Sequence, residues 1–186
     1  EALGPVALVG MALTAAGGKA IGEGNRAQAR RITRWGAGIG IVYMGLAGVA
    51  VVAFREPLAW AMAPPNDPAA AQIVEWTGRL LIVCAIYQVF DALFIIHTHA
   101  LRGAGDTYVP AVLAAIFALV FLLAGGWAAA AVFPELGAVG PWLAGVIYVV
   151  AMGLGMWARW RFGPWERIDL FKPPTATPLP ASASAS

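Results

Sequence analysis

Four long stretches of this sequence contain almost no charged residue, and this feature limits the possible folds most strongly. Residues 35–54, 108–134 and 136–158 contain no Asp, Glu, Lys or Arg, and residues 80–101 contain only Asp91. An α-helix rises about 1.5 Å per residue, so about 20 apolar residues cross the hydrocarbon of a bilayer. Each stretch has this length. The sequence therefore predicts an all-α integral membrane protein.

The composition agrees with this fold class and allows the spans to be placed. Charged residues make up 12% of the chain, about half the share in soluble domains, and hydrophobic residues 60%. A fifth, shorter apolar stretch near the start is interpreted as the end of a helix that begins upstream. The five expected spans are residues 2–20, 35–54, 76–101, 108–132 and 139–158. An interfacial segment, 159–172, and a disordered cytoplasmic tail, 173–186, are expected to follow.

The basic residues orient these spans. If five spans alternate across the membrane, ten of the twelve Lys and Arg residues fall on one side, and only Arg55 and Arg79 on the other. The ten are Lys19, Arg26, Arg30, Arg31, Arg34, Arg102, Arg159, Arg161, Arg167 and Lys172. Loops rich in Lys and Arg remain cytoplasmic, so we expect a multi-pass protein of the plasma (inner) membrane with its basic loops inside. The net charge of +2 gives no support for nucleic-acid binding.

One carboxylate lies in the middle of the third predicted span. Between Arg79 and Arg102 only Asp91 carries a full charge, and its position places it near the bilayer midplane. A charged side chain there costs roughly 2.5 to 3.5 kcal/mol on insertion scales, so such residues usually face a bundle interior or a water-filled cavity. Asp91 is therefore a candidate functional residue. The alternative is a packing role, in which a Ser, Thr or Arg of another helix pairs with it.

Other polar side chains share the face of Asp91. At about 100° per residue, Tyr87, Gln88 and Thr98 project towards the same side of the helix. A phenol, an amide and a hydroxyl beside a carboxylate are suitable partners for a cation. Tyr87 lies one turn from Asp91, so these two residues are the pair that we expect to act together.

Two histidines follow on the same span. His97 and His99 point about 200° apart on a helix and cannot share one ion, so no metal site is predicted. His99 lies about 80° around the helix from Asp91 and could line the same cavity, or it could pack against a neighbouring helix.

Trp142 and Trp157, at the two ends of the last span, are expected at the two membrane interfaces.

Two sequence motifs resemble the MATE (multidrug and toxic compound extrusion) transporters. The first is the run Tyr87, Gln88, Phe90 and Asp91, and the second comprises Leu101, Arg102, Gly103, Gly105, Asp106, Thr107 and Pro110. The upstream residues Gly10, Gly22, Gly24, Asn25, Ala29 and Arg30 also resemble the loop after the eighth helix of that family. The resemblance covers nearly the whole chain except its tail.

This resemblance implies a fold and a function. MATE transporters have twelve helices in two six-helix lobes around a cleft, and they export drugs in exchange for sodium ions or protons. Residues 1–172 would be most of the C-terminal lobe, from late in the eighth helix through the twelfth. Asp91 would be the cation-site carboxylate with Tyr87 beside it, while Gln88, Thr98 and His99 are possible lining residues. The N-terminal lobe and a partner acid on the seventh helix would lie outside this sequence.

The resulting hypothesis is multidrug efflux of cationic or amphipathic organic compounds by antiport, without any cofactor besides the coupling ion. Sodium and the proton both remain possible as the coupling ion. A lipid-linked precursor flippase of the same superfamily is the nearest alternative, although it usually has cationic residues inside its cavity. A non-transporting membrane subunit is another. An enzyme is not expected, because Asp91 has no second catalytic group near it apart from His99.

Overall fold

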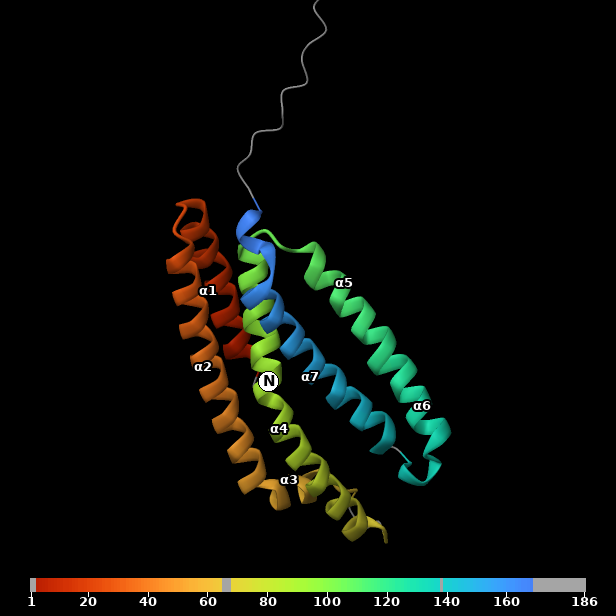
Figure 1. The fold of residues 1–186 in the computed structure, drawn as a ribbon. Helices are drawn as coiled ribbons and strands as arrows, with labels where there is room; N and C mark the ends of the chain where they lie inside the picture. Colours follow the sequence, from red (N-terminus) through yellow and green to blue (C-terminus); the bar gives the residue numbers. More distant parts are fainter. Residues whose placement is uncertain (1–2, 65–67, 138, 169–186) are drawn as a thin grey trace, which may run out of the picture.

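The computed structural model describes residues 3–64, 68–137 and 139–168, and these residues form a bundle of long helices (Figure 1). The helices are α1 (Leu3–Gly22), α2 (Arg26–Ala53), α3 (Arg55–Met62), α4 (Ala70–Gly103), α5 (Tyr108–Phe117), α6 (Gly125–Val132) and α7 (Val139–Phe162). A π-helical segment, Ala118–Ala124, joins α5 to α6, and short 3-10 turns follow at Pro134–Leu136 and Pro164–Arg167.

Five of these helical segments are long and apolar enough to cross a membrane. They are α1, α2, α4, the continuous segment from α5 to α6, and α7. No strand occurs within the ranges that the structure describes. The predicted all-α membrane fold class is thus confirmed.

The helices extend beyond the predicted spans into polar sequence. The second predicted span begins at residue 35, whereas α2 begins at Arg26. The Asn25 side chain caps this helix and accepts a hydrogen bond of 3.0 Å from the Gln28 N–H. This cap and the good helix propensity of Arg and Ala extend the helix through the arginine-rich segment that precedes the predicted span. Similarly, α4 covers 70–103 rather than 76–101, and α7 continues to Phe162, so the expected interfacial segment from residue 159 begins within a helix. The predicted tail, 173–186, lies outside the described residues.

The short helix α3 was not predicted. The sequence predicts an outer connection over residues 55–75, with a turn at 64–68 and a short helix from residue 68 towards the third span. Pro57, however, stands in the first turn of α3, where a missing N–H group costs no hydrogen bond. Ala59 is buried, and α3 packs against α4.

Helix α4 lies at the centre of the bundle. It packs against α1 and α2 on one side and against α7 on another, while α5 and α6 lie beyond α7 (Figure 1). One buried cluster joins α4 to α1 and α2 through Val6, Leu13, Met44, Ala92 and Ile96. A second joins the last turn of α4 to α7 and the segment after it, through Ala100, Leu101, Ala104, Met152, Met156, Trp160 and Trp165.

Small residues allow α4 to approach its neighbours closely. Gly40 of α2 faces Ile96 and Ala92, and Gly153 of α7 lies directly against the backbone of Phe90. Lipid tails are as apolar as the helix surfaces, so association of membrane helices depends on such close packing. These contacts fix the rotation of α4 and so determine which side Asp91 faces.

Candidate functional site: a carboxylate in α4 beside an aromatic cavity

The structure places Asp91 near the middle of α4, half-buried. Among the residues that the structure describes, no hydroxyl, amide or guanidinium forms a hydrogen bond or ion pair with its carboxylate. The carboxylate therefore lacks the internal partner that a pure packing role would require, at least within this part of the chain.

The direction of Asp91 follows from its neighbours on α4. Tyr87 faces Trp142 of α7, with ring centroids 6.0 Å apart, and His99 faces Gly10 of α1. At about 100° per residue, Asp91 points between these two directions. Helix α1 accompanies only the part of α4 that leads to Gly103, so the remaining length of this flank has no α1 beside it (Figure 1). Asp91 therefore lies on a flank between α7 and α1 that the described helices leave partly open.

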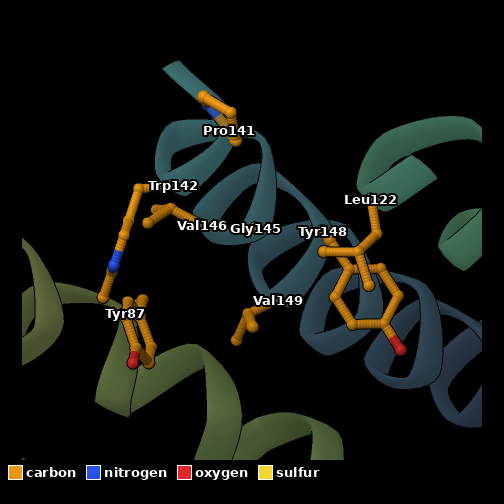
Figure 2. Close-up of a pocket in the computed structure, with 8 residues that line it drawn as sticks. All are labelled: Tyr87, Leu122, Pro141, Trp142, Gly145, Val146, Tyr148 and Val149. Atoms are coloured by element: carbon orange, nitrogen blue, oxygen red, sulfur yellow. The ribbon is translucent and has the colours of Figure 1, made fainter. Parts of the chain in front are cut away.

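A cavity of about 490 Å³ opens one turn from Asp91, between α4, α7 and the segment that joins α5 to α6. Its lining residues are Tyr87, Leu122, Pro141, Trp142, Gly145, Val146, Tyr148 and Val149. Figure 2 shows Tyr87 and Trp142 together at one end of this cavity, with Leu122 and Tyr148 at the other. The lining has aromatic and aliphatic side chains and no charged residue. It suits an apolar or aromatic molecule of drug size.

Of the other predicted site residues, Thr98 shares the face of Asp91 about two turns closer to Gly103. It is 8% exposed, and its hydroxyl has no hydrogen-bond partner among the described residues. Gln88 is half-buried and is not among the residues that line the cavity beside Tyr87. The structure thus brings Tyr87, Asp91 and Thr98 to one flank, with Gln88 beside them.

His99 is held by α1 rather than by the cavity. Its Nδ1 lies 3.0 Å from the Thr14 hydroxyl, which also lies 3.1 Å from the His99 carbonyl oxygen. His97 points elsewhere, with its Nδ1 2.8 Å from the Leu93 carbonyl oxygen. Within the described ranges no group of three or more His, Cys, Asp or Glu residues is arranged to hold a metal ion.

The sequence did not predict that α7 contributes to this cavity. The sequence predicts Trp142 at a membrane interface and indicates no role for Tyr148. Trp142, Gly145 and Val149 recur at intervals of three and four, the spacing of one helical face. That periodicity was visible in the sequence, but the helix that this face contacts was not.

The apolar helices, with a carboxylate in the middle of one of them, define a multi-pass membrane protein. Comparison with known proteins identifies its family: the family model described as MatE matches residues 2–127, and the chain belongs to this family. The resemblance inferred from the motifs around Asp91 is thereby confirmed.

Several curated proteins are similar to the chain. The multidrug resistance protein NorM of Burkholderia vietnamiensis is 31% identical over 109 residues, which are 59% of this chain and 23% of that protein. The multidrug resistance protein MdtK of Pectobacterium atrosepticum is 29% identical over 157 residues (83% and 33%). A probable multidrug resistance protein NorM of Mesorhizobium japonicum is 32% identical over 165 residues (89% and 34%). The chain thus spans about a third or less of these relatives. No solved structure matched it.

Proposed function

We propose that this chain is part of the C-terminal lobe of a multidrug efflux transporter, which exports cationic or amphipathic organic compounds in exchange for sodium ions or protons. The observation that carries this proposal is the position of Asp91, a carboxylate in the apolar middle of α4 without a partner among the described residues. The names of the similar proteins, which are multidrug resistance proteins, support the same activity.

The proposed role of Asp91 follows from the cost of its charge. A carboxylate at the bilayer centre is stabilised when a cation binds to it or when a proton neutralises it. Asp91 would therefore alternate between an ion-loaded state and a state that is open to the substrate. If sodium is the ion, further oxygen ligands are needed, and the Tyr87 hydroxyl one turn away or backbone carbonyl groups would supply them. If a proton is the ion, no further ligand is required.

The aromatic cavity is the proposed contact for the substrate. An organic cation placed against Tyr87 and Trp142 would be attracted by the faces of these rings, and desolvation in the membrane strengthens this attraction. Leu122, Val146 and Val149 would contact its apolar parts. The cavity lies one turn from Asp91, so ion and substrate would compete for the same region.

The proposed orientation and extent follow from the charges and from the relatives. The basic loops and the tail, 173–186, would lie in the cytoplasm, with the protein in the plasma (inner) membrane. Residues 1–172 would form most of one six-helix lobe, and an N-terminal lobe of the same polypeptide would complete the cleft beside Asp91. The lipid bilayer, the coupling ion and the drug would then be its partners.

The test is ion-driven efflux by the full-length protein in proteoliposomes, loaded with a fluorescent cationic dye. Sodium and pH gradients are imposed separately on the wild type, on Asp91→Asn and on the control Glu23→Gln, which changes an exposed carboxylate. We expect gradient-driven efflux in the wild type and the control, with a loss of at least tenfold in Asp91→Asn. The gradient that drives efflux identifies the ion.

Three outcomes would contradict this proposal. Efflux by Asp91→Asn at the native rate would show that this carboxylate does not couple transport. A lack of dye transport under either gradient would favour the lipid-linked precursor flippase. A stable Asp91→Leu variant whose cells have the same phenotype as wild-type cells would favour a non-transporting subunit.

A further inference from the structure

A second cavity, of about 560 Å³, opens on another side of the bundle, between α2, α4 and α7. Its lining changes character with depth in the membrane. Arg30 and Arg34 precede the uncharged stretch of α2, and Arg161 lies in the last turn of α7. Gly38 and Ile41 follow along α2 into its uncharged stretch. The cavity therefore has a cationic end at the predicted cytoplasmic surface and an apolar end deeper in the bundle.

Two of the three arginines have a charge that nothing in the described part of the chain neutralises. Arg30 forms an ion pair with Glu166, whose Oε1 accepts a hydrogen bond of 2.7 Å from the Arg30 Nε. By contrast, no carboxylate among the described residues pairs with Arg34 or Arg161. Both side chains are exposed, and the Arg161 guanidinium lies over the ring of Phe162. The cationic end thus keeps a net positive charge that an anion can neutralise.

This cavity is separate from the proposed coupling site. It contacts α4 through Leu93 and His97. At about 100° per residue, these positions lie about 160° and 120° around the helix from Asp91. The cavity therefore opens on a different flank from the carboxylate, and neither its occupant nor its role depends on the transport proposal.

We propose that this cavity binds an anionic glycerophospholipid of the cytoplasmic leaflet. Arg34 and Arg161 would hold the phosphate, because a guanidinium donates two parallel hydrogen bonds to phosphate oxygens. An acyl chain would lie along Gly38 and Ile41. The Trp157 ring, which is partly exposed beside the cavity, would lie at the level of the glycerol backbone, where indole rings are favoured.

The combination of features favours a lipid over a soluble phosphate ester. Basic cavities between membrane helices on the cytoplasmic side are typical sites for anionic headgroups. A soluble phosphate ester would use only the arginines and leave the apolar end without a partner. A zwitterionic lipid would fill the apolar end, but its own cation would compete for the phosphate. Only an anionic lipid matches both ends.

The test is native mass spectrometry of the full-length protein in detergent, titrated with phosphatidylglycerol or with phosphatidylcholine of the same acyl chains. The variant Arg34→Gln/Arg161→Gln removes both proposed phosphate ligands. Arg26→Gln/Arg102→Gln removes the same charge from two cytoplasmic arginines outside the cavity. We expect the wild type and this control to bind phosphatidylglycerol roughly tenfold more tightly than phosphatidylcholine. In Arg34→Gln/Arg161→Gln the preference should fall to less than twofold.

A second pair of variants tests the apolar end without changing any charge. A Cβ atom added at Gly38 would meet nothing within 4 Å, and the same holds for Gly45, which lies on α2 outside the cavity. Both are tolerant sites, so Gly38→Leu should fold and fill the cavity, whereas Gly45→Leu should fold and leave it open. We expect Gly38→Leu alone to weaken phosphatidylglycerol binding at least fivefold.

Each alternative result overturns the proposal. An equal loss in both arginine variants would mean a diffuse surface charge effect, and unchanged binding in Gly38→Leu would exclude the acyl-chain path. Displacement of phosphatidylglycerol by millimolar glycerol 3-phosphate would identify a soluble phosphate ester as the ligand instead.

Discussion

Arg159 of α7 donates a hydrogen bond of 2.7 Å from its Nε to Oδ2 of Asp106, in the turn that follows α4. The Asp106 side chain is 4% exposed and that of Arg159 is 20% exposed. The backbone of the same turn is fixed as well, because the Asp106 N–H donates to the Leu101 carbonyl oxygen at 2.9 Å. The pair therefore joins the ends of α4 and α7 through a largely buried ion pair.

This asymmetry in burial predicts unequal effects of removing either partner. Arg159→Met leaves a buried carboxylate without a counter-ion, and the loss of one partner of such a pair typically costs about 3 to 5 kcal/mol of folding free energy. Asp106→Ala leaves the more exposed guanidinium, which can reach water, so its cost should be smaller. The measurement is the thermal unfolding of the purified full-length protein in detergent.

The control is Glu23→Ala, which breaks an exposed pair with Lys19 whose closest atoms are 3.9 Å apart. Such surface pairs contribute at most about 1 kcal/mol, so the unfolding temperature should hardly change. If Arg159→Met were as stable as this control, the ion pair would not hold α4 and α7 together.

The sequence was sufficient to predict the spans but not their ends. An uncharged run such as 35–54 marks where a helix meets lipid, because charged groups are excluded from hydrocarbon. It does not mark where the helix ends, because α2 continues through an arginine-rich segment that water and headgroups solvate. The N-terminal end of α2 is indicated instead by a local signal, the capping side chain of Asn25.

The candidate site was predictable only where it lies on one helix. Helical periodicity alone placed Tyr87, Asp91 and Thr98 on one flank of α4. The second wall of the aromatic cavity comes from Trp142 on α7. The cavity proposed to bind a lipid combines α2 with Arg161 of α7. Such contacts depend on how the helices pack, which one amino-acid sequence alone does not specify.

Gly153 provides a sharp test of that packing. A Cβ atom at this position would overlap the Phe90 carbonyl oxygen of α4. Ala gains at most about 1 kcal/mol over Gly in helix propensity, whereas overpacking that shifts backbones typically costs about 1 to 3 kcal/mol. Gly153→Ala should therefore lower the unfolding temperature. At Gly145 the nearest atom would be 3.9 Å away, so Gly145→Ala should leave it unchanged or slightly higher; the reverse order would refute this packing of α4 on α7.

The Thr98→Val substitution can separate the contribution of the Thr98 hydroxyl to stability from its contribution to transport. Its buried hydroxyl has no partner among the described residues, and an unsatisfied buried hydroxyl costs about 1 to 3 kcal/mol. Thr98→Val keeps the shape and removes that group, so the variant should be at least as stable as the wild type. If the hydroxyl serves the ion path to Asp91, efflux should nevertheless fall severalfold. A less stable variant would mean that this hydroxyl has a partner beyond the described residues.

Tyr87 combines two proposed roles that two substitutions can separate. Its ring packs against Trp142 at the aromatic cavity, while its hydroxyl is the proposed extra oxygen ligand beside Asp91. Tyr87→Phe keeps the ring, so the concentration of dye at half-maximal efflux should change less than twofold. Tyr87→Leu removes the ring and should raise that concentration severalfold, because an aromatic face contributes about 0.5 to 2 kcal/mol to cation binding.

The coupling ion decides what else Tyr87→Phe changes. Under sodium coupling the loss of one oxygen ligand should raise the sodium concentration needed for half-maximal efflux several times, because the ion has few ligands in this apolar region. Under proton coupling Asp91 needs no such ligand, and the dependence on the pH gradient should be that of the wild type. Tyr148→Phe, which removes the other hydroxyl of the cavity, is the matched control. If it weakened coupling as much as Tyr87→Phe, the position beside Asp91 would have no special role.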